Sequence, residues 1–247
     1  MEKNNSKVIL VGAGPGDEEL ITLKGINAIK SAEVIIYDDL VGENIIKNNA
    51  SKDAELIYVG KRKGKHSHKQ EEINQIIVDK AKENKLVVRL KGGDSFVFGR
   101  GGEEVLAIKK EGIAYEIIPG ITSSISVPEI FDIPVTHRKV ATSFTVVTGH
   151  EAEDKSEGEK QVKLEDLNAQ TIVILMGISN LENHVKKLLR NPRRNENTPI
   201  AILMDGTRDN QRMVKGTLGT IVEIAQNSDV RAPGIIVVGD VVNILDI

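Results

Sequence analysis

A glycine-rich loop is the first stretch of this chain whose residue types could bind a ligand. Residues 8–19 read VILVGAGPGDEE, an apolar run followed by three spaced glycines and then three carboxylates. Dinucleotide binding requires a glycine where Asp17 stands, and the carboxylates would repel a pyrophosphate at the start of a helix. The loop therefore favours a ligand without phosphate, such as S-adenosylmethionine. A glycine turn that only reverses the chain is the alternative.

Two ionisable residues follow apolar runs of the chain. Asp38 comes directly after the run Val34–Tyr37, and Lys61 follows the run 56–59. In open α/β sheets, side chains just beyond the carboxyl ends of strands lie at the crevice where ligands bind. Both side chains are therefore placed where a ligand can reach them. The simpler interpretations are a helix or turn cap for Asp38 and a surface position for Lys61.

Positive charges are concentrated at a few positions. Residues 61–69 read KRKGKHSHK, with five permanent positive charges and two histidines. Arginine binds carboxylates through two parallel hydrogen bonds, so such residues suit a substrate with several carboxylates. The candidate substrate-binding residues are Arg62, Arg89, Lys91, Arg100 and Arg138. The distal half of the 61–69 run is equally typical of a solvated basic loop.

The elements that must position these residues are predicted by the spacing of apolar side chains. Short apolar runs occur at residues 8–11, 34–37, 56–59, 86–90 and 115–118. Between them, apolar residues recur at helical spacing, for example at 20, 23, 26 and 29, and at 73, 76, 77 and 81. Strands that alternate with helices in this way predict βαβ units and a parallel sheet.

The same rhythm restarts after Pro119 and Gly120. Further apolar runs occur at residues 144–147, 172–175, 200–203 and 235–238, whereas residues 151–160 and 190–199 are polar and predict exposed loops. The pattern predicts an α/β protein with two α/β domains. Residues 1–119 would hold the glycine loop and the catalytic residues, and residues 120–247 would complete the cofactor site.

Composition excludes several classes of function. The chain has 33 basic and 36 acidic residues, a net charge of −3, so no overall attraction to nucleic acid or to an acidic membrane is expected. It has no cysteine, which excludes disulfides and thiol catalysis, and its five histidines show no ligand spacing, so no metal is expected. Only seven residues are aromatic, which favours an aliphatic core of parallel strands covered by helices.

The beginning of the chain indicates where the protein works. Residues 1–7 are polar, and glycines and Pro15 interrupt the first apolar run, so no secretion signal is expected. No run approaches the roughly 18 to 20 apolar residues that cross a bilayer. The expected location is the cytoplasm.

Five stretches together give a specific resemblance. They are VGAGPGD at 11–17, YDDLV at 37–41, VGKR at 59–62, VRLKGGDSFVFGRGGEE at 88–104, and PGITS at 119–123 with PVTHR at 134–138. In this order they resemble the tetrapyrrole methylase family, over about residues 7–240. The long fourth stretch is the most specific of them.

The resemblance implies a fold, an activity and a set of site residues. The fold is the tetrapyrrole methylase fold, with the active site in a cleft between two α/β domains, usually in a homodimer. The activity is methyl transfer from S-adenosylmethionine, without a metal, to uroporphyrinogen III in two steps that give precorrin-2 for sirohaem or cobalamin. By similarity, Asp38 is the proton acceptor and Lys61 the proton donor. The implied cofactor contacts are Pro15, Gly92, Gly93, Asp94, Val97, Thr122, Ser123, Met176 and Gly206.

Two positions depart from the family pattern. Asp39 stands where the family commonly has arginine, and Ser95 stands where it commonly has proline. A second carboxylate beside Asp38 could raise the pKa of that residue or weaken a contact with an anion. These departures concern the substrate more than the cofactor.

Other functions remain possible from the sequence. A sister tetrapyrrole methylase could act on a later precorrin at another ring carbon, and distant relatives with this fold methylate protein or ribosomal RNA. Scarce aromatic residues and the negative net charge argue against RNA. A nicotinamide oxidoreductase and a non-catalytic tetrapyrrole carrier are the alternatives from other classes.

Overall fold

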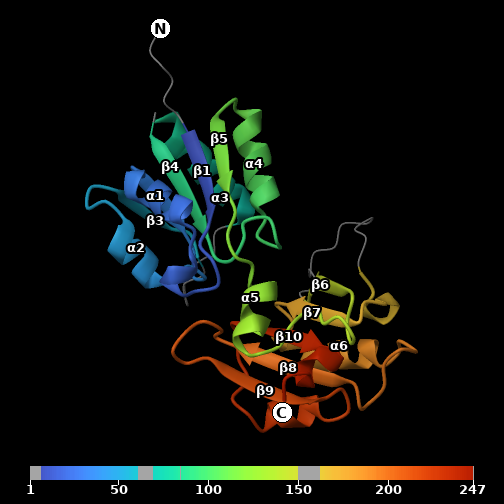
Figure 1. Cartoon of the computed structure of the whole chain (residues 1–247). Helices are drawn as coiled ribbons and strands as arrows, with labels where there is room; N and C mark the ends of the chain where they lie inside the picture. The colour runs from blue at the N-terminus through green and yellow to red at the C-terminus, as the bar shows by residue number, and fades with distance from the viewer. Residues whose placement is uncertain (1–6, 61–68, 84, 150–161, 247) are drawn as a thin grey trace. The chain divides into compact units, whose positions relative to one another are not determined.

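The protein consists of two compact units, residues Met1–Ser123 and Ser124–Ile247. The structure is a computed structural model, and it describes residues 7–60, 69–83, 85–149 and 162–246 (Figure 1). The sequence placed the domain boundary after residue 119, in the loop that follows the fifth strand. Within the described residues, no helix is long and apolar enough to cross a membrane.

The first unit is built on a five-stranded parallel sheet in the order β3-β2-β4-β1-β5. Its strands are β1 (Lys7–Gly12), β2 (Val34–Tyr37), β3 (Glu55–Tyr58), β4 (Leu86–Lys91) and β5 (Ala114–Ile118). Its helices are the 3-10 helix η1 (Glu18–Leu20), α1 (Leu23–Ser31), α2 (Glu43–Asn49), α3 (Gln70–Lys82) and α4 (Gly101–Lys110). All five predicted strands and the predicted parallel pairing are present.

Helices cover both faces of this sheet, as Figure 1 shows. Along β1, Ile9 and Val11 pack with residues of α1 and α2, whereas Val8 and Leu10 pack with residues of α3 and α4. Successive side chains of a strand point to opposite faces, so a strand covered on both faces must be apolar throughout. The unbroken apolar run at residues 8–11 is explained by this arrangement.

The second unit has a five-stranded sheet of different design, in the order β6-β7-β10-β8-β9. Its strands are β6 (Phe144–Thr148), β7 (Thr171–Leu175), β8 (Pro199–Met204), β9 (Arg212–Thr217) and β10 (Gly234–Val238). Its helices are α5 (Ser123–Ile130), η2 (Leu164–Asp166), η3 (Ile178–Asn180), α6 (Leu181–Leu188), α7 (Ile221–Gln226) and η4 (Asp240–Asn243). Only β6 and β7 pair in parallel, and the other three pairings are antiparallel.

Two features of this sheet were not predicted from the sequence. The continued βαβ rhythm indicated parallel pairing, but an apolar run does not specify the direction of its neighbours. Strand β9 was missed because its sequence, RMVKGT, has no apolar run, and it lies at the edge of the sheet with β8 as its neighbour. The polar segment 190–199 does connect α6 to β8 through turns, and the segment 151–160 lies outside the described residues.

Candidate active site

Loops from four strands meet at the carboxyl edge of the first sheet. The backbone of Ala13 donates to the carbonyl of Lys91 at 2.7 Å, which extends the pairing of β1 with β4 beyond the strands. Gly14 and Gly93 then exchange two backbone hydrogen bonds, of 3.1 and 2.7 Å. The chain leaves β1 toward α1 on one face and leaves β4 toward α4 on the other. Such a point, where neighbouring connections part, is where open α/β sheets bind ligands.

Glycines allow these loops to pack backbone against backbone. A Cβ atom at Gly12 would lie 2.5 Å from the nitrogen of Gly120, which joins the loops after β1 and β5. A Cβ at Gly92 would lie 2.5 Å from the Cβ of Leu40, which joins the loops after β4 and β2. Real Cβ atoms do not approach other atoms so closely. These glycines are therefore needed for close approach, and any side chain would push the loops apart.

Gly93 is different, because a Cβ there would make only an ordinary van der Waals contact. Its φ angle of +65° lies in the left-handed region, and a Cβ there would have the nitrogen of Ser123 as its nearest neighbour, at 3.8 Å. A glycine at this point leaves the backbone accessible to a ligand. The predicted cofactor residue Gly93 therefore has the space that its proposed role requires, next to predicted residue Ser123.

The Asp94 carboxylate organises the surrounding loops. One oxygen accepts hydrogen bonds from the amides of Phe96 and Val97, at 2.8 and 3.2 Å, and the other accepts from the amide of Gly120, at 3.1 Å. The family resemblance implies that Asp94 is a cofactor contact. The structure places this carboxylate on backbone amides, where it fixes the loop after β4 to the loop after β5.

The remaining predicted cofactor residues of the first unit lie in the same loops. Pro15 stands between Gly14, which pairs with Gly93, and Gly16, while Thr122 is partly buried in the loop after β5. The next residue of the first loop, Asp17, accepts a hydrogen bond from the amide of Glu19 at 2.9 Å. This carboxylate therefore occupies one of the amides that a phosphate would use, in agreement with the argument against a dinucleotide.

A buried ionic network lies beside this edge. Arg89 and Lys91 point to the face of the sheet covered by α3 and α4, and both donate to one oxygen of Glu104, at 2.9 and 3.1 Å. Arg89 also donates to a carboxylate oxygen of Asp38 at 3.0 Å. The side chains of Arg89 and Glu104 are 3% and 0% exposed, whereas that of Asp38 is 25% exposed. We name Arg89, Lys91, Glu104 and Asp38 the buried ionic network.

The network changes the interpretation of two predicted substrate residues. The sequence analysis assigned Arg89 and Lys91 to substrate carboxylates, but both cations are buried and paired within the protein. Strand alternation gives the reason, since residues 89 and 91 face the helices α3 and α4 and not the solvent. Burial, together with the charge of Arg89, lowers the pKa of Lys91, while Glu104 partly opposes this shift.

The two neighbouring aspartates at the end of β2 have different partners. Asp38 binds Arg89, and its second oxygen accepts from the amide of Leu40 at 3.2 Å. Asp39 accepts a short hydrogen bond from the hydroxyl of Tyr58, at the end of β3. Tyr58 therefore holds the Asp39 carboxylate near the end of β3. Asp39 is the residue that stands where the family commonly has arginine.

The other predicted ionisable residues lie in three different environments. Lys61 and Arg62 lie outside the described residues. Arg100 caps α4 in a left-handed conformation and binds both oxygens of Glu103, at 2.8 and 2.6 Å, with half of its side chain exposed. Arg138 is exposed in a tight turn of the second unit that is closed by backbone hydrogen bonds between His137 and Ala141.

Ser95, the second departure from the family pattern, is fully buried. Its carbonyl accepts a hydrogen bond from the amide of Gly101 at 2.9 Å, and a Cβ at Gly99 or Gly101 would lie within 2.6 Å of that oxygen. Within the part of the chain that the structure describes, its hydroxyl has no hydrogen-bond partner. The loop conformation is therefore held by the backbone of Ser95 and not by its side chain.

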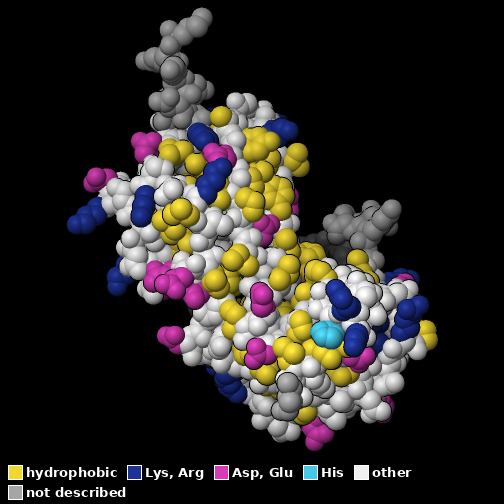
Figure 2. Space-filling view, viewed as in Figure 1, with side chains coloured by type: hydrophobic (Ala, Val, Ile, Leu, Met, Phe, Trp, Pro, Cys, Tyr) yellow, Lys and Arg dark blue, Asp and Glu magenta, His cyan; other side chains and the backbone are white. Residues whose placement is uncertain are grey.

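Apolar side chains are exposed on both units, as Figure 2 shows. In the first unit, several of them belong to the strand-end loops: Leu40, Phe96, Val97, Phe98 and Ile121, each between 36% and 54% exposed. Phe98 adopts a left-handed conformation, with φ of +52°. Exposed aromatic and aliphatic side chains next to a polar edge suit an organic ligand that has both characters.

The second unit contributes its own predicted residues. Met176, after β7, is 51% exposed and left-handed, with φ of +56°. Gly206, after β8, lies between Asp205 and Thr207, which are also left-handed. Because β7 and β8 both run antiparallel to β10, their carboxyl ends share one edge of the sheet. Strained backbone of this kind clusters at functional sites.

Sequence reasoning missed the side-chain cluster at this second edge. Asp205 is buried and accepts hydrogen bonds from Asn210, at 2.9 Å, and from Arg231, at 3.4 Å. The segment Asp205-Gly-Thr207 resembles an ordinary turn, and Arg231 is distant in the sequence, so no local signal marks the cluster.

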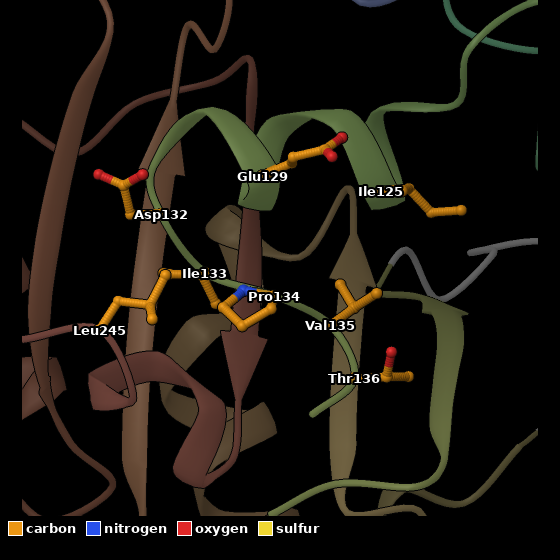
Figure 3. Close-up of a pocket in the computed structure, with 8 residues that line it drawn as sticks. All are labelled: Ile125, Glu129, Asp132, Ile133, Pro134, Val135, Thr136 and Leu245. Atoms are coloured by element: carbon orange, nitrogen blue, oxygen red, sulfur yellow. The ribbon is translucent and has the colours of Figure 1, made fainter. Parts of the chain in front are cut away.

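A cavity of about 300 Å³ lies elsewhere in the second unit (Figure 3). It is lined by Ile125, Glu129, Asp132, Ile133, Pro134, Val135, Thr136 and Leu245. Figure 3 shows Ile125 and Glu129 on α5, with the following segment passing beside the helix. Among the predicted site residues, none lines this cavity.

Comparison with known proteins supports the sequence resemblance. A family model described as Tetrapyrrole (Corrin/Porphyrin) Methylases matches residues 7–222. The uroporphyrinogen-III C-methyltransferase of Methanocaldococcus jannaschii is 72% identical over 240 residues, which cover 97% of this chain and 98% of that protein. The predicted family is thereby confirmed.

Solved structures agree on the fold. The uroporphyrin-III C-methyl transferase of Thermus thermophilus, complexed with S-adenyl homocysteine, has a TM-score of 0.80 and 38% identity, over 96% of this chain and 99% of that one. A cobalt precorrin-4 methyltransferase has a TM-score of 0.83 but 26% identity, over 98% of each chain. The predicted fold class, two α/β domains of this type, is confirmed.

Proposed function

This chain belongs to the tetrapyrrole (corrin/porphyrin) methylase family, and on that premise we propose that it methylates uroporphyrinogen III with S-adenosylmethionine. The product is precorrin-2, formed by two successive methylations of ring carbons. The observation that supports this substrate most strongly is the 72% identity to the Methanocaldococcus jannaschii enzyme over almost the whole of both chains.

The fold alone does not decide the substrate. The cobalt precorrin-4 methyltransferase fits this chain with a TM-score of 0.83, against 0.80 for the Thermus enzyme, but its identity is 26% against 38%. A shared fold can host different substrates, whereas the side chains of the site distinguish them. A later precorrin therefore remains the second candidate, on the strength of that structural similarity.

The residues around Gly93 suit the methyl donor. We assign the cofactor to Pro15, Gly92, Gly93, Asp94, Val97, Thr122 and Ser123 in the first unit and to Met176 and Gly206 in the second. Support comes from the space at Gly93 and from the Asp94 carboxylate, which holds the adjoining loops in place. When bound, S-adenosylmethionine supplies a methyl group on a sulfonium, which is already a good leaving group. The protein's main task is then alignment, which can supply roughly 7 to 11 kcal/mol.

We assign proton transfer to Asp38 and Lys61. When the ring carbon attacks, a C–C bond forms, the C–S bond breaks and S-adenosylhomocysteine leaves, so the alkylated ring carries a positive charge. The methylated carbon bears no hydrogen, so the ring loses a proton from another of its N–H or C–H bonds: that bond breaks, an O–H bond forms on Asp38, and the electron pair returns to the ring. Asp38 suits this role because its carboxylate is held at a strand end and remains partly exposed. Lys61 would donate a proton from the segment after β3, which lies outside the described residues.

Arginine side chains and apolar loops would bind the substrate. We assign the propionate and acetate carboxylates of the macrocycle to Arg62, Arg100 and Arg138, and its apolar surface to exposed loop residues such as Phe96 and Phe98. Arg89 and Lys91 remain part of the proposed site. The contacts that the structure shows for both of them are with Glu104.

The deciding experiment is direct. The protein is incubated with S-adenosylmethionine and enzymatically generated uroporphyrinogen III, and the product is analysed by mass spectrometry for added methyl groups. Two added methyl groups are expected, also in the presence of a metal chelator. Failure to methylate this substrate, together with methylation of a later precorrin, would establish the second candidate. Light scattering tests the proposed homodimer.

Two alternatives from other classes are tested by binding. Titration calorimetry should show binding of S-adenosylmethionine and its demethylated product, and no comparable binding of NAD. A nicotinamide oxidoreductase would bind NAD, and a tetrapyrrole carrier would bind the macrocycle without the methyl donor.

A further inference from the structure

Arg89 connects the proposed base to a buried carboxylate. Its Nε donates to Glu104 at 2.9 Å, one terminal nitrogen donates to the carbonyls of Leu90 and Ile36 at 2.9 and 3.3 Å, and the other donates to Asp38 at 3.0 Å. All three nitrogens of the guanidinium are therefore in use, and the side chain is held in one orientation.

Neither Arg89 nor Glu104 is placed to touch a substrate. Their side chains are 3% and 0% exposed, while one quarter of the Asp38 side chain is exposed. Any effect of the two residues on the reaction must therefore pass through Asp38.

We propose that Arg89, fixed by Glu104, is the positioning residue that orients the Asp38 carboxylate for proton abstraction. The inference rests on the proposed role of Asp38 as the base. It explains why a buried strand carries an arginine on a face covered by helices, where an unpaired charge would be costly.

Arginine suits this position better than lysine. A guanidinium keeps its charge when buried and offers several donors in a fixed plane, so it can hold two carboxylates and two carbonyls at once. Lys91, two residues along the same strand face, shows the contrast, because burial lowers its pKa. The stable positive charge beside Asp38 is therefore that of Arg89.

The charged groups around Asp38 determine the expected pH effects. Strand β4 contributes Arg89 and Lys91, helix α4 contributes Glu104, and the next residue, Asp39, is bound by Tyr58. Arg89 is positive and contacts Asp38 directly, whereas Glu104 is negative and contacts Arg89. Removing the two charges should therefore shift the pH profile in opposite directions.

Variants of these two residues provide the test. In Arg89→Met, the pH at which the turnover number reaches half its maximum on the acid side should rise by about one unit or more. In Glu104→Gln, which keeps the shape of the side chain, that pH should fall. Affinity for S-adenosylhomocysteine, measured by calorimetry, should stay within a few fold in both variants. A merely structural role predicts no such opposed shifts.

A double-mutant cycle tests whether Arg89 acts through Asp38. If it does, adding Arg89→Met to Asp38→Asn should not lower the turnover number further, because the carboxylate it serves is already gone. If the losses of turnover in the two single variants multiply in the double variant, the proposal is overturned. If Arg89→Met does not fold, the test rests on Glu104→Gln alone. An unchanged pH of half-maximal turnover on the acid side in that variant contradicts the inference.

The outcomes separate this inference from the proposed function. If Asp38→Asn keeps normal turnover, the assignment of the base is wrong and the inference ends with it. If Asp38→Asn is inactive but the Arg89 and Glu104 variants keep the normal pH profile, only the inference is wrong. Lys82→Met is the control, because it removes an exposed ion pair with Glu111 in the same unit, at 2.7 Å, and should change neither quantity.

Discussion

The two sheets of this protein treat the ends of their strands differently. In the first, all strands are parallel, so every carboxyl end reaches the same edge and the loops there interlock through glycines such as Gly12, Gly92 and Gly120. In the second, three of four pairings are antiparallel, so β6, β7 and β8 end at one edge and β9 and β10 at the other. Left-handed non-glycine residues occur in loops of both units, for example Phe98 and Met176. The parallel sheet therefore brings all five carboxyl ends to one edge, and the mixed sheet does not.

The sheets also differ in what they bury. The first buries the ionic network of Arg89, Lys91, Glu104 and Asp38 against its strands, whereas β7, β8 and β10 of the second are lined by aliphatic side chains. Burying an ion pair costs desolvation free energy, and removing one partner of a buried pair is strongly destabilising. Such groups therefore need a reason to persist. The difference agrees with the proposal that proton transfer takes place in the first unit.

The largest expected effect concerns the two aspartates of the first unit. Asp38→Asn keeps the shape of the side chain and one acceptor oxygen but removes the base, so the turnover number should fall by about 100 to 10,000 fold. Asp39→Asn, whose carboxylate is bound by Tyr58, should have a much smaller effect. Steady-state kinetics of both variants measure this. The reverse result would identify Asp39 as the base.

A second comparison sets glycines of the two units against each other. Gly120→Ala would drive a Cβ into the backbone of Gly12 and should destabilise the protein by about 3 kcal/mol, near the upper end for overpacking. Gly206→Ala would meet the buried side chain of Val127 and not a backbone, so a smaller loss, of about 1 to 2 kcal/mol, is expected. Denaturant unfolding measures both. Equal losses would mean that the edge of the first sheet is no more tightly packed than that of the second.

A third comparison uses two glycines within the first unit. Gly93 and Gly112 have φ angles of +65° and +68°, and a Cβ at either position would meet no atom closer than 3.8 Å, but Gly112 precedes β5 at the opposite edge of the sheet. Alanine at either position should destabilise by about 1 to 2 kcal/mol through backbone strain. Only Gly93→Ala should also weaken binding of S-adenosylhomocysteine, by about tenfold, or 1.4 kcal/mol. Calorimetry that finds equal affinities would remove Gly93 from the cofactor site.

The smallest expected effects should be alike in the two units. Ser95 and Thr171 each bury a hydroxyl that has no hydrogen-bond partner among the described residues. Ser95→Ala and Thr171→Val remove these hydroxyls, and each should stabilise the protein by about 1 kcal/mol. Thermal unfolding measures the change. A loss of stability in either variant would indicate a hydrogen bond that the structure does not show.

The sequence predicted most strands because local pattern suffices for them. A strand buried on both faces must be apolar along its length, so the runs at residues 8–11 and 86–90 identify β1 and β4 without knowledge of their neighbours. Strand β9 was missed because an edge strand can be polar. The direction of pairing in the second sheet was likewise beyond a local pattern.

The candidate site also has features that the sequence determined and features that only the tertiary structure decided. The sequence determined the glycine loop and the positions of Asp38 and Gly93 at strand ends, because each follows from residue type and short-range spacing. The family was indicated by the resemblance of five motifs spread along the chain. Only the tertiary structure decided the partners of these residues: Arg89 and Glu104, fifteen positions apart, meet beside Asp38, and Tyr58 binds Asp39. Hydrogen bonds and burial depend on which strands and helices become neighbours, and that is set by the packing of the whole unit.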